Sequence, residues 1–295
     1  MGLKLVTEPE SLRISWEGRE LARYVYAPWE ARVESPRPYF HPLRTLGGDV
    51  VSLYRPHDHV WHKGIAWSLP HVGPANFWGG PTFRRDTGYV QRPNNGTTRH
   101  LSFDSVAATD TSVTFAESLA WVTEQGETWF TERRELGISV ADDAWTLRFA
   151  TRFTNVSGRE IAIGSPTTEG RPNAGYGGLF WRGPRSFTGG TVHVPDGSGG
   201  DELMGVRAPW LAFTGQHDDH GRFSTLVFVA ESETKWFVRS QPFACVCPAP
   251  FFDTEVPVAP DQALTYRYAV AIADGRPDPA ALAATATSGG PGEPA

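Results

Sequence analysis

Histidine is concentrated in one short part of the chain. Five of the nine histidines fall between positions 41 and 71, and three of them, His57, His59 and His62, lie within six residues. On an extended strand His57 and His59 would share one face and His62 would lie on the other, so the three rings converge only if the chain turns near Val60–Trp61. Pro56 favours such a turn, because proline cannot donate a ladder hydrogen bond.

These histidines are candidates for three different roles. An imidazole titrates near neutral pH, so His59 or His62 could act as a general acid or base on a sugar or a similar polyol. Neutral imidazoles also bind transition metals, and His57, His59 and His62 could hold a divalent ion with Asp58 or Glu169 completing the shell. The simplest alternative is that the rings cap turns and bond to backbone groups. Their density favours a site, and we take the first role, which needs no cofactor, as the working prediction.

A second irregular stretch covers residues 165–184, SPTTEGRPNAGYGGLFWRGP. Glu169 and Arg171 flank Gly170, and a carboxylate beside a guanidinium stays ionised, which suits a base or an anion clamp. The glycines at positions 170, 175, 177 and 178 would weaken a strand and favour a shaped loop. We therefore predict Glu169 as the catalytic partner of the histidines. The alternative is a surface ion pair between Glu169 and Arg171.

Aromatic and basic side chains near these candidates are predicted to bind the substrate. Flat rings offer an apolar face to the C–H surface of a sugar, and basic groups can hold hydroxyls or a carboxylate. The candidates are His41, His57, Trp61, Trp78, Arg171, Tyr176, Trp181 and Arg182. Packing in the core is the alternative for Trp78 and Trp181. Residues 83–99 are rich in arginine and would either cover an anionic group or form a solvated loop.

Two further groups have simpler interpretations. His217 and His220 enclose two aspartates, but they directly precede a strand predicted at Phe223, so a hairpin turn is a better prediction than a metal site. Cys245 and Cys247 share one face of a predicted strand, where neighbours of this kind seldom satisfy disulfide geometry. We expect two reduced thiols in the core or in a pocket wall.

Period-two alternation dominates the elements that must position these groups. Residues 145–153 alternate large apolar side chains with arginines, and residues 264–272 repeat the pattern. Such alternation is typical of half-buried strands. Residues 113–121 alternate in the same way, and residues 223–230 (FSTLVFVA) predict a more deeply buried strand. Turns rich in glycine and proline separate these runs, which indicates an antiparallel arrangement.

One helix is predicted, at residues 279–286, with Asp278 as its N-cap. The sequence therefore predicts an all-β fold, a large two-sheet antiparallel β-sandwich with one short C-terminal helix. We expect a single domain over residues 1–287, followed by a disordered tail at residues 288–295.

Composition narrows the class of partner. The chain has 27 lysines and arginines against 33 acidic residues, a net charge of −6 with no basic block, which argues against nucleic acid. No apolar run is long enough for a membrane span, and residues 1–10 lack the apolar core of a signal peptide, so we expect a cytoplasmic location and no membrane partner. We expect a small-molecule ligand, and the sequence leaves the oligomeric state open.

Several of these motifs together resemble the PmoA-like family. The matching segments are His41–Pro42, residues 56–64 (PHDHVWHKG), 76–78 (NFW), 170–178 (GRPNAGYGG), 180–182 (FWR), 236–243 (WFVRSQPF) and 273–275 (ADG). The predicted architecture is also similar to that of the galactose-mutarotase-like superfamily, a supersandwich of long antiparallel strands. That second resemblance implies a histidine acid and a glutamate base around the anomeric carbon, roles that His59 or His62 and Glu169 would fill.

One hypothesis and two alternatives follow. We expect a carbohydrate-active enzyme of mutarotase, epimerase, lyase or hydrolase type, with His59, His62 and Glu169 as catalytic residues and no cofactor. The first alternative is a metal-dependent enzyme, such as an oxygenase, in which His57, His59 and His62 bind a divalent transition metal. The second is a non-catalytic carbohydrate-binding protein.

Overall fold

The computed structural model describes residues 2–141 and 143–288. Its main feature is a 16-stranded sheet whose strand pairings are antiparallel. The strands of this sheet are β1 (Leu3–Thr7), β2 (Ser11–Trp16), β3 (Arg19–Val25), β4 (Tyr39–Leu43), β5 (Ile65–Ser68), β9 (Thr97–Ala108), β10 (Ser112–Val122), β11 (Thr128–Ala141), β12 (Ala144–Asn155), β14 (Gly178–Arg182), β15 (Thr191–Val194), β16 (Gly197–Gly199), β17 (Arg207–Gln216), β18 (Phe223–Arg239), β19 (Cys245–Pro248) and β21 (Ala263–Asp274).

Shorter elements complete the described chain. The strands outside the large sheet are β6 (His71–Val72), β13 (Ile161–Gly164) and β20 (Val256–Val258), which pair with one another, and the hairpin of β7 (Thr82–Arg84) and β8 (Gly88–Val90). The helical elements are the 3-10 turns η1 (Arg32–Glu34), η2 (Arg185–Phe187) and η3 (Asp201–Leu203) and the α-helix α1 (Pro279–Ser288). None of the helices in the described ranges is both long and apolar enough to cross a membrane.

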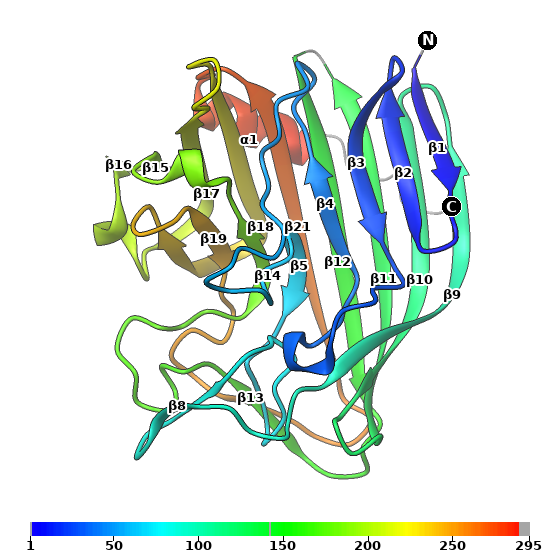
Figure 1. Ribbon diagram of the computed structural model, residues 1–295, viewed down its shortest axis with the longest axis vertical. Helices are drawn as coiled ribbons and strands as arrows, with labels where there is room; N and C mark the ends of the chain where they lie inside the picture. Colours follow the sequence, from blue (N-terminus) through cyan, green and yellow to red (C-terminus); the bar gives the residue numbers. More distant parts are fainter. Residues whose placement is uncertain (1, 142, 289–295) are drawn as a thin grey trace.

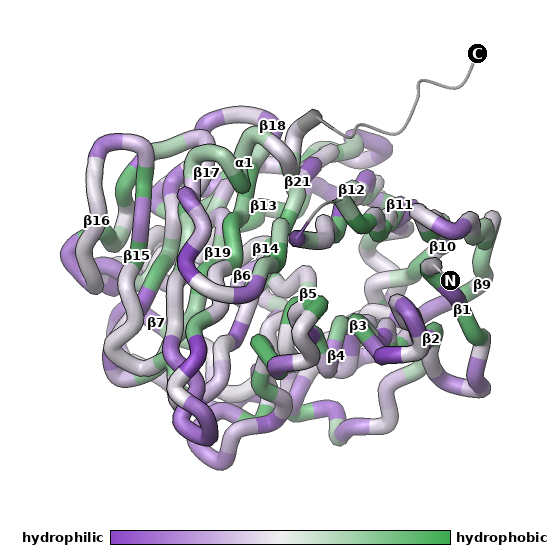
Figure 2. Tube along the Cα trace, turned by 90° about the horizontal axis from the view of Figure 1, so that it is seen from above, coloured by the Kyte–Doolittle hydropathy of each residue, from purple (hydrophilic) through white to green (hydrophobic). Residues whose placement is uncertain are grey.

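The large sheet folds back on itself into two facing layers. Its strand order is β1-β2-β3-β4-β5-β14-β19-β18-β21-β12-β11-β10-β9. We call β1–β5 the first arm and β9–β12 with β21 the second arm; the two arms face each other in Figure 2, and the first lies in front of the second in Figure 1. At the open edge the backbone N–H of Leu3 donates to the carbonyl oxygen of Asp110 at 2.8 Å. The all-β, two-layer antiparallel sandwich predicted from the sequence is confirmed.

The core fills the space between the arms. Trp67 of the first arm packs on Phe149 of the second with ring centroids 6.0 Å apart, and Trp121 stacks on Phe153 at 5.3 Å. Burial of apolar surface stabilises a fold by about 25 cal/mol per Å². The contact of Trp67 with Phe149 therefore helps to hold the two arms together, while that of Trp121 with Phe153 stabilises the inner face of the second arm. The alternation predicted at residues 145–153 is confirmed, because Trp145, Leu147 and Phe149 belong to this core.

Strand β18 connects the two layers. It is 17 residues long, and residues 224–230 pair with β21 while residues 236–239 pair with β19. The strand therefore leaves β21 after Ala230 and continues beside β19, which in turn pairs with β14. The strand predicted at residues 223–230 is thus nine residues longer, and the added residues 231–239 bring Phe237 and Arg239 beside β19.

Helix α1 covers the outer face of the second arm. Leu282, Ala283 and Ala286 pack against alanines and valines of β17, β18 and β21. Asp278 caps the helix, because its carboxylate accepts a hydrogen bond of 3.1 Å from the backbone N–H of Ala280. The predicted helix at residues 279–286 is confirmed and is two residues longer. The predicted tail at residues 288–295 lies outside the described residues apart from Ser288, which ends α1.

Candidate functional site

A cleft lies on the face of β14, β18 and β19 that points away from the core. Strand alternation sets this face: Leu179 and Trp181 of β14 point into the core, and Phe180 between them points into the cleft. Phe237 and Arg239 at the end of β18 line the same cleft. Its volume is about 440 Å³, within the range of sites for small ligands.

Three separate segments of chain line the cleft. They are residues 59–89, which begin in the histidine segment, the stretch at residues 165–184, and the region from the end of β18 to the start of β19. The lining residues are His59, Trp61, His62, Trp78, Gly79, Pro81, Tyr89, Arg171, Tyr176, Phe180, Phe237, Arg239, Pro242, Phe243 and Cys245. The two irregular stretches singled out in the sequence therefore meet, and a third segment joins them.

The histidine segment forms a tight loop between β4 and β5. Tyr54 and Lys63 form an isolated antiparallel bridge, and between them the N–H of His59 donates to the Pro56 carbonyl at 3.0 Å and the N–H of His62 to the His59 carbonyl at 2.9 Å. These turns stack the rings of His59 and His62, with centroids 4.7 Å apart and planes 17° apart. The turn expected near Val60–Trp61 therefore brings two of the three histidines together.

His59 is oriented by its neighbour Asp58. Its Nδ1 lies 2.9 Å from a carboxylate oxygen of Asp58, so Nδ1 carries a proton and donates it. Burial alone would raise the pKa of the Asp58 carboxyl, but the hydrogen bond from His59, a backbone hydrogen bond, the charge of Arg182 and the hydrogen bond from Arg185 outweigh it and hold this pKa far below its ordinary value. When His59 is neutral, its Nε2 is consequently an unprotonated nitrogen, which can accept a proton from a ligand.

His62 has the opposite tautomer. Its Nδ1 lies 3.0 Å from a guanidinium nitrogen of Arg182, and a guanidinium can only donate, so Nδ1 accepts and Nε2 carries the proton. Burial, followed by the charges of His59 and Arg182, lowers the pKa of His62 well below its ordinary value. The side chain is 4% exposed and stays neutral. The stacked pair thus offers a ligand one acceptor nitrogen and one donor N–H.

Glu169, predicted from the sequence as the catalytic partner of the histidines, does not line this cleft. The chain turns at Gly170, where φ is +99°, and this turn separates Glu169 from Arg171. The Glu169 carboxylate pairs with Arg84 at 3.5 Å, while Arg171 lines the cleft. The residues next to each other in sequence therefore face different partners, and Asp58 is the carboxylate bonded to a cleft histidine.

Three of the predicted aromatic residues line the cleft and one does not. Trp61, Trp78 and Tyr176 lie in the wall, with the rings of Trp78 and Tyr176 4.6 Å apart. Trp61 packs directly on a pair of glycines, and a Cβ at Gly79 would lie 2.5 Å from the Trp61 Cβ. Trp181 was predicted to bind substrate, but it is fully buried in the core and its indole N–H donates to the Val51 carbonyl at 2.8 Å.

Three predicted binding residues do not line the cleft. His41 bonds to Ser52 at 2.9 Å, and His57 is exposed with its Nδ1 3.2 Å from a guanidinium nitrogen of Arg185. Arg182 is fully buried behind the cleft wall, where its guanidinium lies 3.7 Å from the ring centroid of Phe243. Arg182 therefore contacts two residues of the cleft, His62 and Phe243, without lining it.

Tyr89, Arg239 and Phe243 also line the cleft, and none of them was among the predicted site residues. A usable signal for Arg239 was its alternation with Trp236 and Val238, which places it on the face opposite the core. Tyr89 belongs to the arginine-rich residues 83–99, and its hydroxyl lies 2.8 Å from that of Tyr176. This part of the chain does cover one side of the cleft.

Cys245 and Cys247 lie on the cleft side of β19, as predicted, and are not bridged. Burial raises the pKa of the Cys245 thiol to about 12. A thiol with so high a pKa is protonated at neutral pH and is a poor nucleophile. Cys245 is therefore a wall group of the cleft.

The placement of His57, His59 and His62 does not favour a metal site. The stacked rings of His59 and His62 direct their in-plane lone pairs alongside each other and not toward a common point, and Nδ1 of His62 is occupied by Arg182. Within the described ranges, one group has the spacing for a metal ion, His217, Asp219 and His220. It forms the predicted turn before β18, and both ring nitrogens of His220 already have hydrogen-bond partners.

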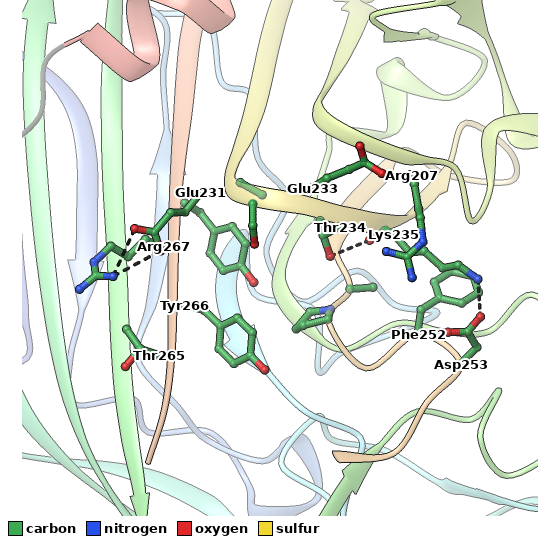
Figure 3. A pocket seen from close by; sticks show the side chains of 15 residues that line it. Arg207, Glu231, Glu233, Thr234, Lys235, Phe252, Asp253, Thr265, Tyr266 and Arg267 are labelled. Carbon is green, nitrogen blue, oxygen red and sulfur yellow. Dashed lines mark hydrogen bonds and ion pairs between the residues drawn. The ribbon is translucent and has the colours of Figure 1, made fainter. Parts of the chain in front are cut away.

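A second groove opens where β18 leaves β21, and Figure 3 shows it from close by. Its charged groups are largely paired with one another: Glu231 with Arg267 at 3.3 Å on one side and Lys235 with Asp253 on the other, with Tyr266 between them. The groove lacks an imidazole, so it offers no general acid or base that titrates near neutral pH.

Comparison with solved structures finds distant matches that cover most of this chain. GH36 α-galactosidase AgaB from Geobacillus stearothermophilus is 11% identical with a TM-score of 0.48, and the match covers 93% of this chain and 41% of the galactosidase. Galactose 1-epimerase from Lactobacillus acidophilus NCFM is 6% identical with a TM-score of 0.42, and the match covers 93% and 99% of the two chains. A galactose mutarotase-like protein from Lactobacillus casei ATCC 334 is 10% identical with a TM-score of 0.37, covering 92% and 100%.

With TM-scores below 0.5 and identities of 6–11%, these matches assign neither a fold family nor an activity to the chain. No curated protein sequence matches the chain. The resemblance to the PmoA-like family stays a prediction. A family profile described as a family of unknown function, DUF6807, matches residues 11–287. The chain therefore belongs to the DUF6807 family.

Proposed function

We propose that the cleft is the active site of a carbohydrate-active enzyme that uses acid–base chemistry and needs no redox cofactor. The observation that carries this proposal is the stacked pair of imidazoles with opposite tautomers, His59 with a free acceptor nitrogen and His62 with a donor N–H. A base and a hydrogen-bond donor side by side can remove a proton from a substrate and stabilise the oxygen on which negative charge develops.

The roles of the cleft residues follow from their contacts. Nε2 of His59 takes the proton from a hydroxyl or an acidic C–H of the sugar, and Asp58 stabilises the imidazolium that forms. Nε2–H of His62 donates to a ring or exocyclic oxygen of the substrate. Trp61, Trp78 and Tyr176 supply the flat surfaces on which the C–H face of a sugar packs. In mutarotation, epimerisation or elimination the His59 imidazolium returns this proton to the product or to the leaving group, and in hydrolysis His59 would take the proton of the attacking water and return it to the leaving oxygen. None of these routes uses Glu169.

The test is a substrate screen with matched histidine variants. Anomeric exchange, epimerisation and elimination are followed by NMR for a panel of neutral and acidic sugars. We expect His59→Gln to lower kcat/KM by about 100-fold or more, because general base catalysis contributes about that much. His193→Gln, in β15 away from the cleft, is the control and should retain activity at a similar Tm.

Two results would contradict the proposal. One is binding of a sugar without conversion over hours, which would favour the non-catalytic binding protein. The other is a His59→Gln protein with full activity, which would show that His59 is not the catalytic base. If His59→Gln loses activity together with a large fall in Tm, His59→Asn provides a second variant, because it also removes the imidazole but has a smaller side chain. Loss of activity in His59→Asn at an unchanged Tm would then be due to loss of the base.

A further inference from the structure

The ionisable side chains that line the cleft include bases without matching acids. Two arginines, Arg171 and Arg239, and two histidines line it, and none of the described aspartates and glutamates does. From this we infer that the ligand carries an oxyanion, a carboxylate or phosphate group on the sugar, which Arg171 and Arg239 hold. The inference names the substrate class for the proposed function and rests on that function for the sugar part.

Arg171 has most of its donors free. It donates to the Tyr89 hydroxyl, and its guanidinium lies 4.8 Å from the centroid of the Tyr89 ring. No carboxylate of the described residues forms an ion pair with it. A guanidinium has five N–H donors in a planar fork that matches a carboxylate or phosphate, so the bond to Tyr89 leaves this fork available.

Arg239 is fixed on a strand and is only loosely paired. Its guanidinium packs over the Phe237 ring at 5.7 Å and contacts Asp201 through one nitrogen at 3.4 Å. The carboxylate of Asp201 also accepts the backbone N–H groups of Ser240 and Gln241 at 2.6 and 2.9 Å. Asp201 therefore serves to hold the chain after β18, and Arg239 keeps donors for a ligand.

The balance of donors and acceptors points the same way. Hydroxyl groups of a neutral sugar bring donors that need acceptors, and carboxylates usually supply these. The cleft offers the acceptor nitrogen of His59, while the hydroxyls of Tyr89 and Tyr176 bond to each other. Asp58, the carboxylate bonded to His59, is already bonded to Arg185 as well. An acceptor-rich, negatively charged ligand fits this surplus of donors.

Two further arginines, Arg182 and Arg185, lie behind the cleft wall that His59 and His62 form. Arg182 is fully buried, and its Nε has no hydrogen-bond partner among the described residues. Together Arg182 and Arg185 face one carboxylate, that of Asp58, so this side of the cleft has an excess of positive charge. A ligand anion reduces the repulsion among these groups, and a neutral sugar does not.

The experiment measures binding by isothermal titration for four probes: D-glucuronate, D-glucose 6-phosphate, D-glucose and inorganic phosphate. We expect an acidic sugar to bind at least about tenfold more tightly than glucose, with an affinity that falls as salt rises. The first two probes distinguish a carboxylate from a phosphate, and inorganic phosphate shows whether the anion alone suffices.

Matched arginine variants locate the binding group. Arg171→Gln and Arg239→Gln should each remove most of the preference for the acidic sugar. Arg207→Gln is the control, because Arg207 is an exposed arginine that lines the second groove (Figure 3). Equal binding of glucose and the acidic sugars, failure of every acidic sugar to bind, or equal losses in Arg171→Gln and Arg207→Gln would overturn the inference.

Failure of this inference and failure of the proposed function give different results. If acidic sugars bind through the two arginines but no sugar is converted, the anion site stands and the enzyme proposal fails. If neutral sugars are converted as well as acidic ones and Arg171→Gln has no effect, the enzyme proposal stands and the anion site fails. His59→Gln should bind the acidic sugar with little change while losing turnover.

Discussion

Acid should destabilise this protein in part through one buried histidine, His71, and the effect has a calculable size. His71 lies in β6 with 4% of its surface exposed, and its Nε2 is buried without a hydrogen-bond partner among the described residues. Burial, with a smaller contribution from Arg84, lowers the pKa of His71 from 6.5 to about 4. The native state therefore keeps this ring neutral at pH values where the unfolded chain protonates it.

The sign and the size of the effect follow from proton linkage. Between the two pKa values the unfolded state binds more protons, so the free energy of unfolding falls as the pH drops below 6.5. At pH 7 the contribution is close to zero. At pH 5 the unfolded ring is almost fully protonated and the native ring about one-tenth protonated, which costs about 2 kcal/mol of stability.

The assay compares urea unfolding of the wild type and His71→Leu at pH 7 and pH 5. The loss of stability between the two pH values should be about 2 kcal/mol smaller in His71→Leu, because the carboxylates contribute equally to both proteins and cancel. Val72→Ala is the control. Val72, the neighbour of His71 in β6, is fully buried and does not titrate, so its truncation should lower the free energy of unfolding by the same amount at both pH values. An unchanged pH dependence in His71→Leu would refute the reasoning.

Three further predictions concern the cleft. Asp58→Asn should lower kcat/KM by about tenfold or more and shift the tautomer of His59, which ¹⁵N NMR of the imidazole detects, whereas a merely structural change would leave that tautomer unaltered. Glu169→Gln should leave kcat/KM within about twofold, since its carboxylate is part of a surface ion pair with Arg84; lost turnover at an unchanged Tm would restore Glu169 as the base. Gly79→Ala should destabilise the protein by about 1–3 kcal/mol more than Gly126→Ala, because both have positive φ values, +102° and +90°, but only at Gly79 does the added Cβ meet other atoms, the Trp61 Cβ at 2.5 Å and the Glu34 carbonyl oxygen at 2.6 Å. Equal thermal shifts in the two glycine variants would show that these close contacts are not the cause.

The strands were predictable because alternation reveals their period, but the period does not always reveal which face is buried. In β12 charged residues mark the solvent face, so the core face of residues 145–153 was readable. In β14 all five residues are buried, since one face packs in the core and the other lines the cleft. The sequence therefore could not distinguish Trp181, which lies in the core, from Phe180, which lines the cleft.

The segments that form the candidate site were predictable from the sequence, but the carboxylate that partners the histidines was not. Density and residue type identified the histidine loop and the stretch that supplies Arg171 and Tyr176. The direction of Glu169 depends on the backbone of Gly170, and a positive φ at that glycine sends two sequence neighbours to different partners. A loop conformation of this kind has no period from which it could be inferred.

Strand β18 explains why the third segment was missed and why the cleft exists. Residues 231–234, ESET, are polar and resemble a turn, yet they carry the strand across from β21 to β19. Beyond that crossing Trp236 and Val238 still face the core, so alternation turns Phe237 and Arg239 to the outer face. Helix α1 covers the outer face of β18 where this strand pairs with β21, at Val227 and Val229. Beyond residue 234 the helix no longer covers β18, and loops form the walls of a cleft over its outer face. Arg239 thus lies on a strand, while His59 lies on a loop and is held by Asp58, so the proposed anion-binding group and the proposed base can be altered independently by mutation.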